Sequence, residues 1–228
     1  MLIAISIILL LILIFAPQIW TRSVFQRYNQ ELEQLPGTGA ELARHLLHRF
    51  ELDEVEVEIA DNGDNHYDPD ARKIRLAENI GEVKSITSVV IAAHEFGHAL
   101  QHRHHYKPLQ VRSQLARIIS ISEKIAAMML VAFPFAAMLT RLPQVGGLLL
   151  ACGLLILFLP VIFHLVTLPV ELDASFNRAL PVLEQGQYLP DSALPIARKI
   201  LLAAALTYLS ASLASVLNFY RWLVFLRR

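Results

Sequence analysis

The pattern of hydrophobic and polar residues divides the chain into four apolar stretches separated by polar ones. The uncharged apolar stretches are 1–15, 125–140, 148–168 and 200–217. A helix needs about 20 apolar residues to cross the ~30 Å hydrocarbon core of a bilayer. The pattern therefore predicts four membrane spans. The second covers only about 24 Å as a helix, so Lys124 and Arg141 would have to snorkel or the bilayer would have to thin.

The polar stretch 21–117 predicts a small domain that contains both helices and strands. The predicted elements are a helix, two strands and a second helix, over 38–50, 55–59, 73–76 and 86–102. Thr38 and Glu41 have the spacing of a capping box at the start of the first helix. A turn is expected at 61–64. The strand at 73–76 is expected at the edge of the sheet, where an extended peptide could pair with it.

Composition supports a membrane protein and excludes other classes. Of the 228 residues, 55% are hydrophobic, and they cluster in blocks. Lys and Arg balance Asp and Glu at 20 each, so the net charge of zero gives no indication of a nucleic-acid partner. The single cysteine, Cys152, lies in an apolar stretch, which excludes an intrachain disulfide and a multi-cysteine zinc site.

The candidate chemistry lies in the second predicted helix, where residues 94–98 form an HExxH motif. Two histidines four residues apart lie on one face of a helix, so His94 and His98 can reach one metal ion. Glu95 then points to the open side of that ion, where it can take a proton from a water molecule. Gly97 lies between the ligands, where a small residue permits close packing. From the motif alone, an amphipathic helix with two ordinary histidines remains an alternative.

A catalytic zinc ion needs a third protein ligand, and three residues compete for that role. His102 lies about 12 Å along the helix axis from His94, which is too far for one ion. His104 has the spacing of a third histidine ligand, but the sharp turn that it requires needs a glycine where Gln101 stands. Glu171 follows the predicted transmembrane hairpin, which returns the chain to the side of the HExxH helix. Topology therefore favours Glu171, with a solvated charge beside the membrane as its alternative.

Short segments spread over most of the chain carry a further signal. They are the N-terminal span and residues 66–69, 92–101, 106–109 and 171–175. In this order they resemble a bacterial family of neutral zinc metallopeptidases, the YugP-like membrane proteins. The layout is more distantly similar to HtpX-type membrane peptidases, in which a glutamate after a transmembrane hairpin completes the zinc site.

The resemblance implies one Zn²⁺ per chain, with His94, His98 and Glu171 as ligands and Glu95 as the general base. HtpX-type enzymes carry an aspartate four residues after the ligand glutamate. In this chain Ser175 stands there and an acid stands at Asp173, whose part in orienting the ligands is therefore open.

The expected activity is zinc-dependent peptide-bond hydrolysis, with a polypeptide substrate. The candidates for stabilising the transition state or orienting the ligands are His66, Tyr67, His102 and Tyr106, besides Asp173. Two other classes stay open. One is an intramembrane, site-2-like protease. The charged residues at the end of the HExxH helix argue against it. The other is a non-catalytic membrane scaffold with a structural metal.

The expected fold class is an α-helical multi-pass membrane protein with a small α+β, zincin-like metallopeptidase domain at the membrane surface. The expected parts are an N-terminal anchor, the zincin-like domain, a transmembrane hairpin, a segment with the third ligand, and a C-terminal transmembrane helix with a basic tail, at 1–20, 21–117, 118–168, 169–199 and 200–228. Arg22 and Arg27 follow a first span with no positive charge before it. This distribution favours the inner membrane, with the site on the cytoplasmic face. The basic residues of the tail do not fit this orientation, because they fall on the opposite side if the fourth stretch spans the membrane.

Overall fold

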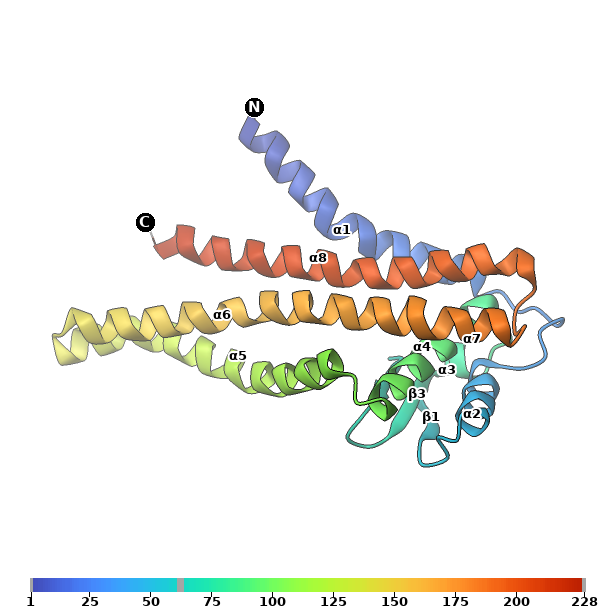
Figure 1. Cartoon of the computed structure of the whole chain (residues 1–228). Coiled ribbons are helices and arrows are strands. Elements are labelled where there is room, and N and C mark those ends of the chain that lie inside the picture. Colours follow the sequence, from blue (N-terminus) through green and yellow to red (C-terminus); the bar gives the residue numbers. More distant parts are fainter. Residues whose placement is uncertain (1, 61–63, 227–228) are drawn as a thin grey trace.

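The computed structural model describes residues 2–60 and 64–226, and its long helices extend from a small sheet domain (Figure 1). In chain order the elements are α1 (Leu2–Tyr28), α2 (Gly39–Arg49), β1 (Glu56–Ala60), β2 (His66–Asp68), β3 (Lys73–Ala77), α3 (Glu78–Gly81), α4 (Ile86–Arg103), α5 (Lys107–Thr140), α6 (Pro143–Leu172), the π-helix η1 (Asp173–Ala179), α7 (Leu180–Gln185), the 3₁₀ turn η2 (Asp191–Ala193) and α8 (Leu194–Leu226). Residues 61–63 of the predicted turn and residues 227–228 of the predicted tail lie outside the described residues.

The sheet has the strand order β1-β3-β2, with β1 parallel and β2 antiparallel to β3. Ile74 of β3 pairs with Val57 on one side and with Tyr67 on the other. The prediction that 73–76 forms an edge strand is therefore wrong, since β3 is the central strand. The sequence pattern missed β2 because a strand of three residues is too short to show alternation.

The first helix of the domain begins as predicted, with a complete capping box. The Glu41 carboxylate accepts from the Thr38 backbone N–H at 2.8 Å, and the Glu41 N–H donates to the Thr38 hydroxyl at 3.3 Å. Leu42, Leu46 and Leu47 of α2 are buried against the core that α2 shares with α4 and the sheet. These contacts hold α4, which is buried from residue 87 to residue 101, in the middle of the domain.

The apolar stretches at 125–140, 148–168 and 200–217 lie in α5, α6 and α8. Within the described residues, two helical segments are long and apolar enough to cross a membrane, Gln144–Gln185 and Asp191–Leu217. A third is counted if α5, bent by 43° near Pro134, is taken as one span. The predicted first span lies in α1, which is not among these segments, and it stays a prediction.

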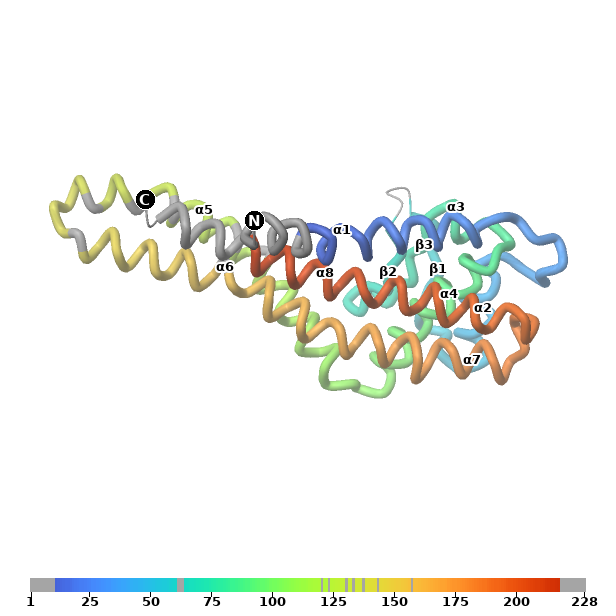
Figure 2. The backbone as a smooth tube through the Cα atoms, turned by 90° about the horizontal axis from the view of Figure 1, so that it is seen from above, coloured from blue at the N-terminus to red at the C-terminus, as the bar shows by residue number. Residues whose placement is uncertain are grey.

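The helices α1 and α8 run side by side over the sheet domain (Figure 2). The Thr21 hydroxyl of α1 donates to the Ala203 carbonyl of α8 at 2.6 Å. The α5–α6 hairpin and α8 extend away from the domain in one direction (Figure 1). The domain-proximal ends of α1, α6 and α8 thus meet around α4.

Candidate metal centre

The two histidines of the HExxH motif lie one turn apart on the same face of α4. Their ring centroids are 4.8 Å apart. Glu171, at the end of α6, reaches the same point: its Oε2 lies 3.1 Å from His94 Nε2 and 3.5 Å from His98 Nε2. The three ligand atoms that these residues can offer all lie within 4.8 Å of one another. The convergence that topology favoured at the sequence level is thus present in the fold.

Gly97 permits this convergence by letting α4 approach the chain after Glu171. A Cβ at Gly97 would lie 2.6 Å from the Ala174 carbonyl oxygen, a distance that side-chain carbons do not adopt. Any larger residue would therefore push η1 away from α4. The π-helical turn of η1 begins two residues after Glu171, and such turns are frequent at functional sites.

Gln101 fixes the orientation of His98. Its amide nitrogen has two acceptors, the Val170 carbonyl at 2.8 Å and Asp173 Oδ2 at 2.8 Å. The amide oxygen must therefore be the atom that lies 2.9 Å from His98 Nδ1, and it can only accept. It follows that His98 donates from Nδ1, so Nε2 is the ring nitrogen left to bind a cation.

His98 Nε2 faces the Glu171 carboxylate at 3.5 Å. Two facing acceptors in a buried site repel, so this arrangement requires a metal ion or a proton between them. Two ligands about 2.1 Å from one zinc ion, at the tetrahedral angle, are about 3.4 Å apart. The distances from Glu171 Oε2 to the two Nε2 atoms, 3.1 and 3.5 Å, agree with that spacing.

His94 is held in the same way by a second partner. The Ser175 hydroxyl lies 3.0 Å from His94 Nδ1, so Nε2 is directed at Glu171. Burial by itself would lower the pKa of His94. The hydrogen bond to Glu171 and the negative charge of Glu95 outweigh burial and raise the pKa. The surroundings of His94 therefore favour positive charge at its ring.

The second oxygen of Glu171 is buried and has no hydrogen bond in the described part of the chain. Its charge is balanced by Arg112 of α5, whose Nη2 lies 3.2 Å from Oε1 as an ion pair. Two imidazoles and one carboxylate are a donor set that zinc accepts, with one coordination position left open. The residues present therefore fit a catalytic zinc ion.

Glu95 borders a cavity of about 250 Å³ together with His94 and Glu171. Glu95 is only 5% exposed, and its carboxylate has no hydrogen bond or ion pair among the described residues. Tyr208 of α8 also lines the cavity, and its side chain interacts with Glu171. The cavity thus brings an unpaired carboxylate and a phenol to the candidate metal centre.

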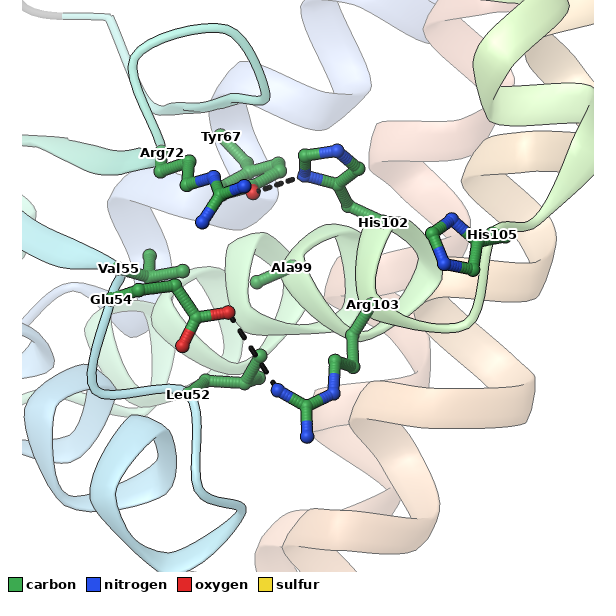
Figure 3. A pocket seen from close by; sticks show the side chains of 9 residues that line it. All are labelled: Leu52, Glu54, Val55, Tyr67, Arg72, Ala99, His102, Arg103 and His105. Atoms are coloured by element: carbon green, nitrogen blue, oxygen red, sulfur yellow. Dashed lines mark hydrogen bonds and ion pairs between the residues drawn. The ribbon is translucent and has the colours of Figure 1, made fainter.

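The other sequence candidates make different contacts, and none of them lines this cavity. Tyr67 and His102 border a separate pocket of about 200 Å³ with Arg72 and Glu54 (Figure 3). The Tyr67 hydroxyl lies 2.7 Å from His102 Nδ1. Burial raises the pKa of Tyr67 to about 12 and lowers that of His102, so Tyr67 donates to a neutral ring.

His66 and Tyr106 each lie beside an arginine, and neither lines the cavity at His94, Glu95 and Glu171. His66 Nε2 is 3.4 Å from Arg75 Nη1, and the Arg178 guanidinium lies 5.5 Å from the Tyr106 ring centre. Asp173 does reach the site, through Gln101 and hence His98.

Sequence reasoning assigned no role to four residues that contact His94, His98 or Glu171, namely Gln101, Arg112, Ser175 and Tyr208. Gln101 had a usable signal, since it follows His98 by three residues and so lies on the same helix face. Arg112 and Tyr208 come from α5 and α8, and nothing local to them indicated the site.

Comparison with known proteins gives the family. Residues 3–227 match the family described as "Putative neutral zinc metallopeptidase". The chain belongs to this family. A protein of Bacillus subtilis (strain 168) described as "Putative membrane protease YugP" is 32% identical over 211 residues, which cover 92% of this chain and 90% of that protein. No solved structure matches.

Family membership confirms the resemblance drawn from the short sequence segments, and it implies zinc as the metal. The chemistry of the donor set agrees, because the described residues that gather in α4 and at the end of α6 are two imidazoles and a carboxylate.

Proposed function

We propose that the protein is a membrane-embedded zinc metallopeptidase in which His94, His98 and Glu171 hold one Zn²⁺ and Glu95 is the general base. The main support for this proposal is that the Nε2 atoms of the two histidines and a carboxylate oxygen of Glu171 converge beside the unpaired carboxylate of Glu95. The zincin-type ligand set, with a glutamate as third ligand, belongs to this proposal. So does the assignment of a polypeptide as the substrate, which the description of the Bacillus relative as a membrane protease supports.

The residues around the site divide the chemistry between them. Zinc, when bound, would supply Lewis-acid catalysis by polarising a carbonyl and lowering the pKa of a water molecule. The Glu95 carboxylate accepts a proton from the attacking water and returns it to the nitrogen of the leaving amine. Gln101 and Ser175 keep the Nδ1 side of both histidines occupied, so that each Nε2 stays directed at the shared point.

Tyr208 is the best-placed donor for the oxygen that gains negative charge during the reaction. Its side chain lines the same cavity as Glu95 and His94, and it comes from a helix, α8, that packs on α4. A phenol held beside the reacting carbonyl can donate a hydrogen bond that strengthens as charge develops. His66, Tyr67, His102 and Tyr106 lack this position.

The membrane arrangement is part of the proposal. The sheet and α4 form a zincin-like domain at the membrane surface, and α1, the α5–α6 hairpin and α8 are the multi-pass membrane part. The domain-proximal ends of these helices carry basic residues, at Arg22, Arg27, Arg112, Arg117, Arg198 and Lys199. By the positive-inside rule the site then faces the cytoplasm.

Reporter fusions test the orientation. Alkaline phosphatase fused in the 141–147 turn or after Arg228 is expected to be active, since both places lie across the membrane from the domain. Active cytoplasmic reporters at these two places would reverse the proposed orientation.

The substitution Glu95→Gln tests the activity. The variant keeps the shape of the side chain but cannot accept a proton, so we expect full zinc content and no detectable hydrolysis of labelled casein. Glu82→Gln is the matched control, because Glu82 is exposed outside the cavity. If Glu95→Gln hydrolysed casein at the wild-type rate, Glu95 would not be the general base. Zinc binding without hydrolysis by the wild type would favour a scaffold with a structural metal.

A further inference from the structure

The cavity beside Glu95 has one wall that takes no part in the chemistry. That wall comes mainly from α1, from the first turns of α4 and from α8, and most of its residues are apolar. The apolar ones are Phe25, Val90, Ile91, Ile200, Leu201 and Ala204. Thr21, Asn65 and Thr207 also line the cavity, and both threonine hydroxyls donate to backbone carbonyls of α8. The wall carries no charged side chain, whereas His94, Glu95 and Glu171 lie together on the metal side of the same cavity.

The size of the cavity indicates what it can hold. Pockets that bind a whole small molecule enclose about 300–1,000 Å³. This one encloses about 250 Å³, which suits a single side chain. A polar or charged side chain placed against the apolar wall would lose its water without gaining a partner there. A large apolar side chain loses nothing of that kind.

The position of the cavity indicates where in a substrate that side chain lies. His94 and Glu95 border the cavity and also belong to the reacting centre. Consecutive Cα atoms are only 3.80 Å apart, so a side chain in the cavity belongs to a residue that flanks the bond being cut.

We infer that this cavity is the specificity pocket of the enzyme, and that it selects substrates with a large apolar side chain, such as Leu, Ile or Phe, next to the scissile bond. The inference rests on the proposed function and adds the substrate class to it. Selection comes from the residues of α1 and α8 that close the cavity over α4.

Two substitutions change the room in the pocket in opposite directions. Ala204→Leu adds bulk to the wall, so the preference is expected to move from Phe and Leu towards Ala. Phe25→Ala removes bulk, so the preference is expected to move towards Trp and Phe. Because a single methylene in an apolar pocket changes selectivity by about 10–200-fold, each shift is expected to be at least ~10-fold. Ala214→Leu is the matched control, since Ala214 lies on α8 at a partly exposed position and does not line the cavity.

The experiment uses the purified full-length chain, loaded with zinc, and an unbiased peptide library whose products are sequenced. The wild type and Ala214→Leu are expected to show the same enrichment of large apolar residues at one position beside the cut. Each variant is judged by the ratio of kcat/KM for two peptides that differ only at this position, so a partly unfolded preparation does not change the result.

Cleavage without apolar enrichment would overturn the inference and leave the proposed function in place. So would an enrichment that neither Ala204→Leu nor Phe25→Ala alters. No cleavage of any library peptide by the zinc-loaded wild type would overturn the proposed function itself, and the specificity pocket with it.

Discussion

Gln101 Oε1 accepts a hydrogen bond from His98 Nδ1 at 2.9 Å, and this contact decides which nitrogen of His98 is free to bind a metal. The amide cannot turn over, since its nitrogen donates to Val170 and Asp173 at 2.8 Å each. Asp173 is fixed in turn by Arg178, whose Nε lies 2.7 Å away. A chain of hydrogen bonds thus runs from the surface of η1 to the candidate metal centre.

Gln101→Leu removes the acceptor while nearly preserving the volume of the side chain. His98 then loses its fixed tautomer, and zinc affinity is expected to fall by about 10–100-fold. Competition with a fluorescent zinc chelator measures this change. Gln110→Leu, at an exposed position on α5, serves as the control. Unchanged zinc affinity in Gln101→Leu would show that Gln101 does not orient His98.

Tyr208→Phe removes only the hydroxyl group that we propose donates a hydrogen bond to the oxygen of the reacting carbonyl. Loss of one such donor is expected to lower kcat by about 10²–10³. KM and zinc content are expected to stay at wild-type values, because the phenyl ring still fills its place. Tyr28→Phe on α1 controls for the loss of a phenol outside the cavity. A loss of zinc with unchanged kcat per bound zinc would instead make Tyr208 a residue that positions Glu171.

Removal of zinc is expected to destabilise the fold, because Glu171 is 2% exposed and faces two imidazoles. A ligand at 100 times its Kd stabilises the folded state by about 2.7 kcal/mol. For a chain of this size that corresponds to a drop in Tm of about 5–10 °C on chelation. Differential scanning fluorimetry in detergent measures it. Glu171→Ala should show no chelator effect, and an equal effect in that variant would contradict Glu171 as a ligand.

The Tyr67–His102 pair is expected to make stability depend on pH. Burial lowers the pKa of His102 below its ordinary value of 6.5, so the unfolded chain binds this proton first as pH falls. The contribution of the pair is complete above about pH 6.5 and declines at lower pH. In the chelated protein, the Tm of His102→Gln should therefore fall less between pH 7.5 and pH 5 than that of the wild type. Parallel Tm curves would contradict the lowered pKa.

Local sequence spacing was enough to predict the two histidines of the candidate site, and the order of the apolar stretches indicated the glutamate. The HExxH spacing places His94 and His98 on one helix face, and the hairpin brings Glu171 back beside them. The capping box of Thr38 and Glu41 is equally local, and it is present in the structure. The HExxH spacing and the capping box depend on a few neighbouring residues, so the sequence carries them directly. Glu171 is distant in the chain, and the order of the apolar stretches indicated it.

The features that sequence reasoning missed depend on long-range packing. The strand order β1-β3-β2 follows from pairing across the sheet, and nothing in 73–76 itself indicates a central position. Arg112 and Tyr208 reach Glu171 only because α5 and α8 pack around α6 and α4. The apolar wall of the cavity is formed in the same way, by residues that look like ordinary membrane-helix positions.

The most direct test of the account is anomalous diffraction at the zinc absorption edge from crystals of the zinc-loaded, full-length chain. The account predicts one strong peak per chain, about 2.0–2.2 Å from His94 Nε2, His98 Nε2 and a carboxylate oxygen of Glu171. A zinc peak that excludes Glu171 from coordination, or no peak at this cluster, would contradict it.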